Sequence, residues 1–134
     1  MSHINERLIR QLFDTFRRGD REEAVTLFTD DAVFAYPGLG ALHGEWRGRA
    51  GILRLWAEQD RCSGNRFRPE PLDLVAGDRH VFLMVGISPE DGSRPWRRVV
   101  AYEVSDGMIT GARVFEDDPA AAEAFFSKGE EASS

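Results

Sequence analysis

The chain has 134 residues, 42% of them hydrophobic and 30% charged, and it carries a formal net charge of −6. This length suits one domain with a real core, and the ordinary composition argues against global disorder. Because an acidic surface repels phosphate groups, the charge argues against nucleic acid and anionic membranes as partners.

The cysteine and histidine positions indicate neither a disulfide nor a metal site. Cys62 is the only cysteine, so no internal disulfide and no thiolate cluster for zinc can form, which fits the reducing cytoplasm. No two histidines have metal-ligand spacing. The N-terminus lacks the pattern of a signal peptide, and no apolar run is long enough to span a membrane. We therefore expect a soluble cytoplasmic protein with no metal and no other cofactor.

The first half of the chain predicts three helices and one strand. Apolar residues at helical spacing indicate a first helix, which Gly19 ends. Asp20, with Glu23 three residues later, makes a capping-box-like start for a short second helix that includes Phe28. Pro37 ends a β-rich segment, and a glycine-rich loop separates it from a third amphipathic run. The helices are expected over residues 4–18, 20–28 and 50–64, and the strand over residues 32–36.

The second half predicts an antiparallel meander followed by a short helix. Four extended segments alternate with turns, of which Asp106-Gly107 is the strongest hairpin signal because glycine tolerates a positive φ. Asp118 as N-cap and Pro119 at the first helical position open a last helix that reaches Phe126. The strands are expected over residues 67–75, 80–88, 96–104 and 108–115.

Together these elements predict the α+β class, with helices packed against a mostly antiparallel sheet. Residues 1–128 would form one domain and residues 129–134 a flexible tail. The segment 80–88 is apolar on both faces, so both faces should be hidden. Helices account for one face, and a partner subunit or a ligand cavity is needed for the other.

Several short motifs accompany this order of elements. They are Gly19-Asp20, the stretch 27–32, Gly44 with the stretch 47–52, and the stretch 106–109. With them, the chain resembles the SnoaL-like domains related to ketosteroid isomerase, within the nuclear transport factor 2-like superfamily, from about Glu6 to Phe126. The resemblance implies a cone-shaped curved sheet wrapped by three N-terminal helices and a short C-terminal helix. It also implies an apolar pocket in the cone and a homodimer formed through the outer sheet face.

The catalytic residues of well-known relatives are absent at the matching positions. The resemblance places Tyr36 where ketosteroid isomerase has its general-base aspartate, Leu12 where it has a donor tyrosine, and Val100 where it has a protonated acid. It places Val114 where limonene epoxide hydrolase has an aspartate. A phenol is a weak base near neutral pH, because its ordinary pKa is about 10. The resemblance therefore implies the cavity and leaves its chemistry open.

Strand alternation, together with this resemblance, directs a few polar groups into the predicted cavity. Arg98 and Tyr102 share the cavity face of one strand, and Glu116 lies on the matching face of the next. Arg98 and Glu116 would either pair at the rim of the cone or orient a carbonyl or carboxylate ligand. Tyr36 and Tyr102 would either donate hydrogen bonds to an oxyanion, with Arg98 lowering the phenol pKa, or be core aromatics with satisfied hydroxyls. The candidate catalytic residues are thus Tyr36, Arg98, Tyr102 and Glu116.

Large apolar side chains would either line the pocket or fill it. The candidate ligand-binding residues are Phe16, Phe34, Trp56, Met84, Trp96, Val100 and Val114. We expect a homodimer that binds an apolar or carbonyl-bearing small molecule and acts as a metal-independent cyclase, isomerase or lyase of SnoaL type. The alternative is a non-catalytic ligand-binding or dimerisation module of the same fold. An open pocket with Arg98 and Glu116 pointing inward would favour the enzyme, and a filled cone with both pointing outward would favour the module.

Overall fold

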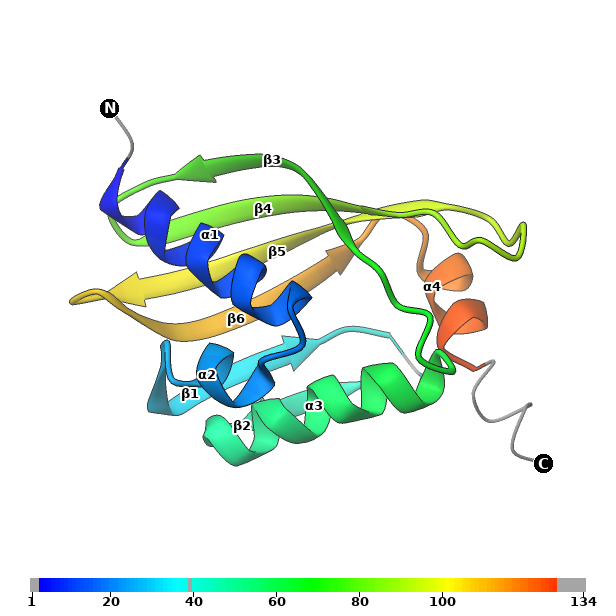
Figure 1. Cartoon of the computed structure of the whole chain (residues 1–134), viewed down its shortest axis with the longest axis horizontal. Coiled ribbons are helices and arrows are strands. Elements are labelled where there is room, and N and C mark those ends of the chain that lie inside the picture. Colours follow the sequence, from blue (N-terminus) through cyan, green and yellow to red (C-terminus); the bar gives the residue numbers. More distant parts are fainter. Residues whose placement is uncertain (1–2, 39, 128–134) are drawn as a thin grey trace.

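The computed structural model describes residues 3–38 and 40–127, so the predicted tail lies outside the described residues. The helices and strands follow one another along the chain in the order α1 (Ile4–Arg17), α2 (Arg21–Val25), β1 (Phe28–Tyr36), β2 (Gly44–Arg47), α3 (Gly48–Cys62), β3 (Glu70–Ala76), β4 (His80–Ile87), β5 (Trp96–Ser105), β6 (Met108–Glu116) and α4 (Pro119–Phe126). The strands form one sheet in the order β2-β1-β6-β5-β4-β3 (Figure 1). Neighbouring strands are antiparallel, except β1 and β6, which are parallel. The predicted α+β class with a curved, mostly antiparallel sheet is confirmed.

Gly19 and Asp20 separate α1 from α2, as predicted. Gly19 has a φ of 85°, a left-handed conformation that favours glycine, and Asp20 accepts a hydrogen bond from a backbone N–H of the first turn of α2 at 3.2 Å. The predicted extension of this helix to Phe28 is wrong, because Phe28 begins β1. Phe28 pairs with Ile109 of β6, whose N–H also donates to the Leu27 carbonyl at 2.9 Å. Pairing with a distant strand therefore overrides the local helical pattern.

The largest differences from the expected strands concern β1, β2 and β3. β1 begins at Phe28, four residues before the predicted start at residue 32, and its register with β6 is irregular before Val33. β2 was not predicted, since four residues are too few to show an alternation pattern. β3 begins at Glu70, three residues after the predicted start at Phe67. Phe67 instead packs against Phe126 of α4, with ring centroids 5.2 Å apart.

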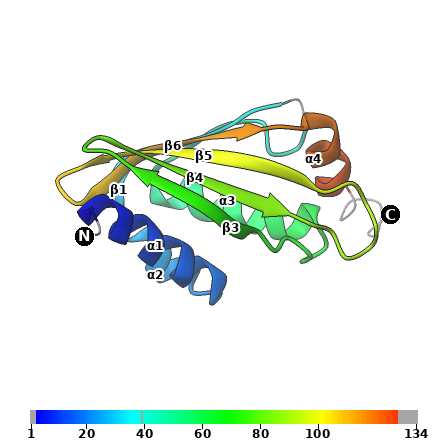
Figure 2. The same ribbon diagram turned by 90° about the horizontal axis from the view of Figure 1, so that it is seen from above.

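The two faces of the sheet differ in what covers them. Leu83 of β4 pairs with Val100 of β5, which pairs with Val114 of β6, and all three are buried. The helices α1 and α3 lie on this inner face (Figures 1 and 2). On the outer face, the side chains of Phe82 and Phe115 are 47% and 54% exposed. In a single chain the helices thus hide only one face of β4.

Helix α4 lies across one end of the sheet (Figure 2). Asp118 caps it, as predicted, by accepting a hydrogen bond from the Ala121 N–H at 3.0 Å. Phe125 and Phe126 of α4 pack against Trp96, with ring centroids 5.4 and 6.2 Å apart. None of the helices within the described ranges combines the length and the apolar character that crossing a membrane requires.

Candidate active site

Arg98 and Glu116 form a buried, two-point ion pair. They are direct cross-strand partners on β5 and β6, which explains why the two side chains meet. Nε of Arg98 donates to Oε1 of Glu116 at 2.7 Å, and Nη2 donates to Oε2 at 3.0 Å. Only 4% of each side chain is exposed. A salt bridge at the open rim is therefore excluded, because both charges point inward and are withdrawn from water.

Tyr36 joins this pair from the end of β1. Its hydroxyl accepts a hydrogen bond from Nη2 of Arg98. The guanidinium carbon of Arg98 lies 5.2 Å from the ring centroids of Tyr36 and Phe67 and 5.7 Å from that of Phe126. Aromatic faces attract a cation, so the rings hold the arginine in place as well as covering it. The fold thus brings together three of the four predicted catalytic residues from β1, β5 and β6.

The two buried phenols are neutral. Burial raises the pKa of Tyr36 to about 12, although the charge and hydrogen bond of Arg98 act in the opposite direction. Burial likewise raises the pKa of Tyr102. Arg98 acts to lower the pKa of both phenols, as expected, but burial outweighs it. Both tyrosines remain hydrogen-bond donors rather than bases.

Arg98 stays charged although it is buried. Burial acts to lower the pKa of its guanidinium, but the negative charge of Glu116 and the hydrogen bonds to Glu116 and Tyr36 outweigh burial and raise the pKa. A fixed positive charge in an apolar interior is a strong electrostatic element, because the surrounding dielectric is low.

The cone itself holds only a small cavity. Its volume is about 50 Å³, and Arg98, Val100 and Tyr102 line its sheet side. From the helices, the rings of Phe16 and Trp56 pack edge to face, with centroids 5.2 Å apart, and line the opposite side. Pockets that hold a small molecule usually measure about 300–1,000 Å³, so this cavity admits one functional group and not a whole ligand. The structure thus combines one feature expected of the enzyme with one expected of the binding module. Arg98 and Glu116 point inward, as expected of the enzyme, but the cone is nearly filled, as expected of the module.

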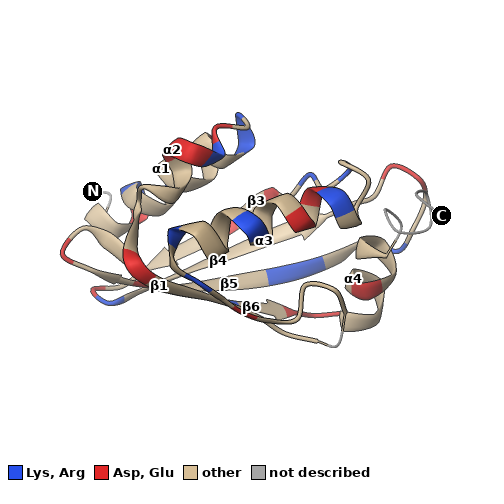
Figure 3. Ribbon diagram, turned by 90° about the horizontal axis from the view of Figure 1, so that it is seen from below, with Lys and Arg blue, Asp and Glu red and all other residues tan. Residues whose placement is uncertain are grey.

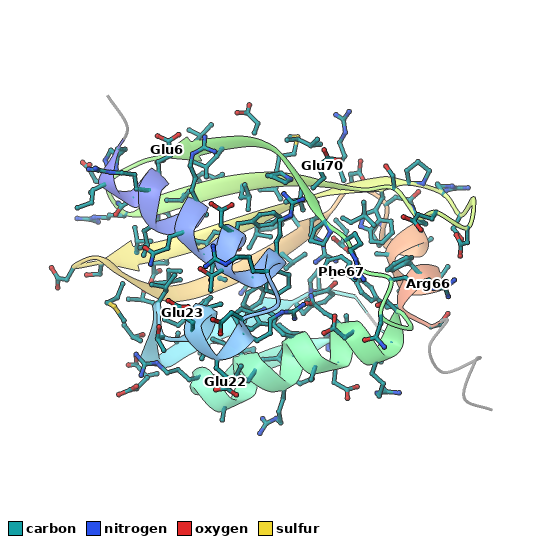
Figure 4. All side chains as sticks on the ribbon, viewed as in Figure 1. Glu6, Glu22, Glu23, Arg66, Phe67 and Glu70 are labelled. Atoms are coloured by element: carbon teal, nitrogen blue, oxygen red, sulfur yellow. The ribbon has the colours of Figure 1, made fainter. Side chains whose placement is uncertain are left out.

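A larger cavity opens at the mouth of the cone. Its volume is about 600 Å³, and it lies between the end of α1, the start of α2, the end of α3 and the segment leading into β3. We call this cavity the vestibule. Phe16, Phe67 and Pro69 line both the vestibule and the inner cavity, so a ligand in the vestibule would reach the cone past these three residues. Figure 4 shows Phe67 on the segment between α3 and β3.

A third cavity lies on the other side of the ion pair. This groove has a volume of about 690 Å³ and runs between the loop after β1 and helix α4. Tyr36, Val114, Glu116 and Phe126 border it, and most of its other lining groups are apolar. The buried cluster of Tyr36, Arg98 and Glu116 therefore forms a wall between the groove and the cone.

The structure sorts the predicted ligand-binding residues into three groups. Phe16, Phe34, Trp56 and Val100 line the inner cavity as predicted, whereas Val114 borders the groove. The prediction is wrong for Met84, which pairs with Val99 on the outer face because alternation turns it away from Leu83. Trp96 is buried on the inner side but packs against α4 and lines none of these cavities.

Gln59 and Phe67 are site residues that the sequence did not single out. Gln59 is a buried polar residue that lines the inner cavity, and its side chain acts to lower the pKa of Tyr36. Its position three residues after Trp56, on the apolar face of a helix, was the available signal. No three His, Cys, Asp or Glu side chains gather into a metal-binding group within residues 3–38 and 40–127.

Comparisons of sequence place the chain among known proteins. The sequence profile described as a SnoaL-like domain matches residues 9–112. An uncharacterized protein of Mycobacterium tuberculosis is 26% identical over 122 residues, which cover 89% of this chain and 93% of that protein.

Solved structures share the fold. Bal32a, from a soil-derived mobile gene cassette, has a TM-score of 0.82 and 21% identity, covering 92% of this chain and 96% of that one. A candidate ketosteroid isomerase from Kribbella flavida has a TM-score of 0.67 and 25% identity, covering 83% and 76%. A candidate polyketide cyclase from Sinorhizobium meliloti has a TM-score of 0.70 and 18% identity, covering 85% and 100%.

Proposed function

Since the chain belongs to the SnoaL-like domain family, as its motifs predicted, we propose that it binds an apolar, carbonyl-bearing small molecule and acts on it as a metal-independent cyclase, isomerase or lyase. The observation that carries this proposal is the buried Arg98–Glu116 pair, joined by Tyr36 and placed between two cavities. The likeness to a candidate polyketide cyclase and a candidate ketosteroid isomerase supports the reaction class.

Arg98 and Tyr102 would stabilise the substrate oxygen. Glu116 and Tyr36 occupy Nε and Nη2 of Arg98, which leaves the two N–H groups of Nη1 to bind a carbonyl oxygen. Tyr102 lines the same inner cavity and, as a neutral phenol, would donate a second hydrogen bond. Donors that are fixed before the reaction and aimed at a developing negative charge lower the barrier, because they need no reorganisation.

Glu116 would move the proton. Each of its carboxylate oxygens accepts one hydrogen bond from Arg98 and keeps another lone pair free. Glu116 borders the groove and not the inner cavity, so in the proposed step the cluster shifts until the carboxylate reaches the carbon next to the carbonyl and takes a proton from it. The electron pair of that C–H bond then forms an enolate, which Arg98 and Tyr102 hold. Return of the proton elsewhere gives an isomerase, attack of the enolate on a second carbonyl gives a cyclase, and loss of a leaving group gives a lyase.

The cavity sizes indicate how such a substrate would bind. The inner cavity of about 50 Å³ takes the reacting group, and the vestibule of about 600 Å³ takes the rest of the molecule. Ligand pockets for small molecules usually measure about 300–1,000 Å³, and the volume of the vestibule lies within this range.

The second candidate function is a non-catalytic binding or dimerisation module. The observation in its favour is the narrow interior of the cone, which Phe16 and Trp56 nearly fill.

We also propose that the chain forms a homodimer through the outer sheet face. Phe82 and Phe115 are about half exposed there, and apolar side chains gathered on one sheet face are typical of an interface.

The decisive experiment identifies the ligand and then measures its turnover. Protein purified from its host with the native ligand retained would be analysed by mass spectrometry, and that compound would be the assay substrate. Glu116→Gln should lower kcat by about 100-fold, the usual contribution of one positioned base, and Tyr36→Phe should also lower kcat, because it removes a group that positions Arg98. Glu90→Gln, at an exposed loop position, is the matched control and should leave kcat unchanged. If both cluster variants retain full turnover, the catalytic assignment is wrong.

A further inference from the structure

The vestibule concentrates positive charge in an acidic protein. Four arginines line it, against two carboxylates, although the chain as a whole carries a net charge of −6. The turn between α1 and α2, which forms one side of the vestibule, is blue at its tip in Figure 3. The charged lining residues are Arg17, Arg18, Arg21, Arg68, Asp60 and Glu70.

Arg21 is fixed in position but incompletely bonded. Its guanidinium carbon lies 3.9 Å from the centroid of the Phe16 ring, so the charged group lies directly on the aromatic residue that borders the inner cavity. Its Nε and Nη1 atoms are buried and form no hydrogen bond. An oxygen of Asp60 lies 3.5 Å from Nη1, close enough for an ion pair but without hydrogen-bond geometry. Because Nε and Nη1 are withdrawn from solvent, a ligand in the vestibule would meet the exposed quarter of the Arg21 side chain, whose positive charge is only loosely paired with Asp60.

The other three arginines also keep donors free. Arg18 donates to the Thr15 hydroxyl at 3.4 Å, and Arg68 donates to the Phe67 carbonyl at 2.9 Å, both neutral acceptors. The Arg17 guanidinium lies over an aromatic ring. Among the residues that the structure describes, no carboxylate lies within ion-pair distance of these three guanidinium groups. The positive charge of the vestibule is therefore only partly compensated.

We propose that the vestibule binds the oxyanion of an acidic substrate, such as a carboxylate on an otherwise apolar molecule. Guanidinium groups match this chemistry, because their planar N–H donors bind two oxygens at once. The anionic end would lie against Arg21 and Arg68, and the apolar body would pass Phe16 and Phe67 toward the inner cavity. This proposal rests on the proposed function in one respect: it takes from it that the carbonyl group of the substrate enters the inner cavity. The binding of the oxyanion itself depends only on the vestibule.

Two fluorescent probes of the same shape test the proposal. 8-Anilinonaphthalene-1-sulfonate carries an oxyanion on an aromatic body, and N-phenyl-1-naphthylamine is the same body without the charge. The protein should bind the sulfonate about ten-fold more tightly than the neutral probe. Added salt should weaken binding of the sulfonate and leave binding of the neutral probe unchanged, because salt screens charge.

Variants of the arginines locate the binding site. Arg21→Gln and Arg68→Gln should each remove most of the preference for the sulfonate, whereas Arg54→Gln, an equal loss of charge at an exposed position on α3, should preserve it. Circular dichroism and the unfolding midpoint show whether each variant is folded. If Arg21→Gln does not fold, Arg68→Gln still tests the proposal. Equal affinity for the two probes would overturn the proposal, and so would a preference that survives both vestibule substitutions. The kinetics of Tyr36→Phe test the proposed reaction separately. Turnover measurements can therefore contradict the reaction, and probe-binding measurements can contradict oxyanion binding in the vestibule, each without affecting the other.

Discussion

Arg98 and Glu116 face each other across β5 and β6 and form a two-point ion pair with only 4% of either side chain exposed. The rings of Tyr36 and Phe67 lie against the arginine, which also donates to the Tyr36 hydroxyl. Removal of either residue would therefore leave an unpaired buried charge, which would affect both the stability of the fold and the chemistry of the site.

Loss of one partner should destabilise the fold strongly. Glu116→Ala leaves an uncompensated buried guanidinium, and we expect the free energy of unfolding to fall by about 3–5 kcal/mol. Urea denaturation measures this change. Glu6→Ala, which removes the partner of Arg10 in an exposed pair, is the control and should change stability by less than about 1 kcal/mol. Similar effects of the two substitutions would contradict burial of the Arg98–Glu116 pair.

Loss of both partners should cost less than loss of one. The double variant Arg98→Met with Glu116→Leu replaces the pair with apolar groups, and replacement of buried ion pairs in this way is often neutral or stabilising. We expect its unfolding midpoint in urea to lie near that of the original protein, with turnover abolished. A double variant less stable than Glu116→Ala would show that the pair itself stabilises the fold.

Stability should fall at high pH because of the two tyrosines. The chain contains two tyrosines, both buried, and burial raises the pKa of Tyr36 to about 12 and raises that of Tyr102 as well. An unfolded tyrosine ionises near pH 10, so above about pH 10 the unfolded state binds fewer protons than the folded state. Below about pH 10 the tyrosines make their full contribution to the free energy of unfolding. As the pH rises above about 10, each tyrosine lowers this free energy by about 1.4 kcal/mol per pH unit until the pH reaches its folded pKa.

Urea denaturation over a series of alkaline pH values measures this slope. The slope should decrease by about half in Tyr36→Phe, because one of two tyrosines no longer ionises. The phenolate absorbance of the folded protein gives an independent measurement and should rise only well above pH 10. Ionisation of both tyrosines near pH 10 in folded protein would show that they are not buried.

The outer sheet face should carry the homodimer. Phe82→Glu or Phe115→Glu would place a charge in the interface, so each variant should sediment as a monomer at concentrations where the unchanged protein is a dimer. Ile4→Glu is the matched control, since Ile4 is 65% exposed on α1 and away from this face. A monomer for the unchanged protein at micromolar concentration would contradict stable association.

The β5–β6 hairpin should depend on Gly107. Asp106 and Gly107 have φ values of 51° and 75°, the left-handed turn that the Asp-Gly sequence predicted. Gly107→Ala should lower the free energy of unfolding by about 1 kcal/mol or more, because alanine is strained at positive φ. Thermal denaturation measures this loss. Gly77→Ala in the β3–β4 turn serves as comparison, since an added Cβ meets only the His80 carbonyl oxygen at 3.5 Å.

Local patterns predicted five of the six strands and the shared face of two charged residues on adjacent strands. Alternation placed Arg98 and Glu116 on one sheet face, and hairpin geometry then makes them neighbours. The same alternation placed Met84 on the wrong face, because β4 is apolar on both faces and its pattern gives no direction. The direction is set by which face the helices cover, a tertiary property.

Contacts between distant segments could not be predicted from the sequence. Tyr36 reaches Arg98 because β1 runs beside β6, and no local signal indicates that pairing. The vestibule likewise gathers Arg21 and Arg68 from separate elements, and only the folded chain brings them to one cavity. The volume left inside the cone also depends on how Phe16 packs, which composition does not reveal.

The parallel pairing of β1 with β6 has a consequence for folding during synthesis. One edge of β1 is satisfied by β2 close in sequence, but the other must wait for the residues from Ile109 to Arg113. Contacts of such large sequence separation raise contact order and slow folding. A nascent chain that has not yet released β6 from the ribosome exposes open strand edges on both β1 and β5, which are templates for aggregation. The sheet therefore closes only when its last strand arrives between two strands made earlier.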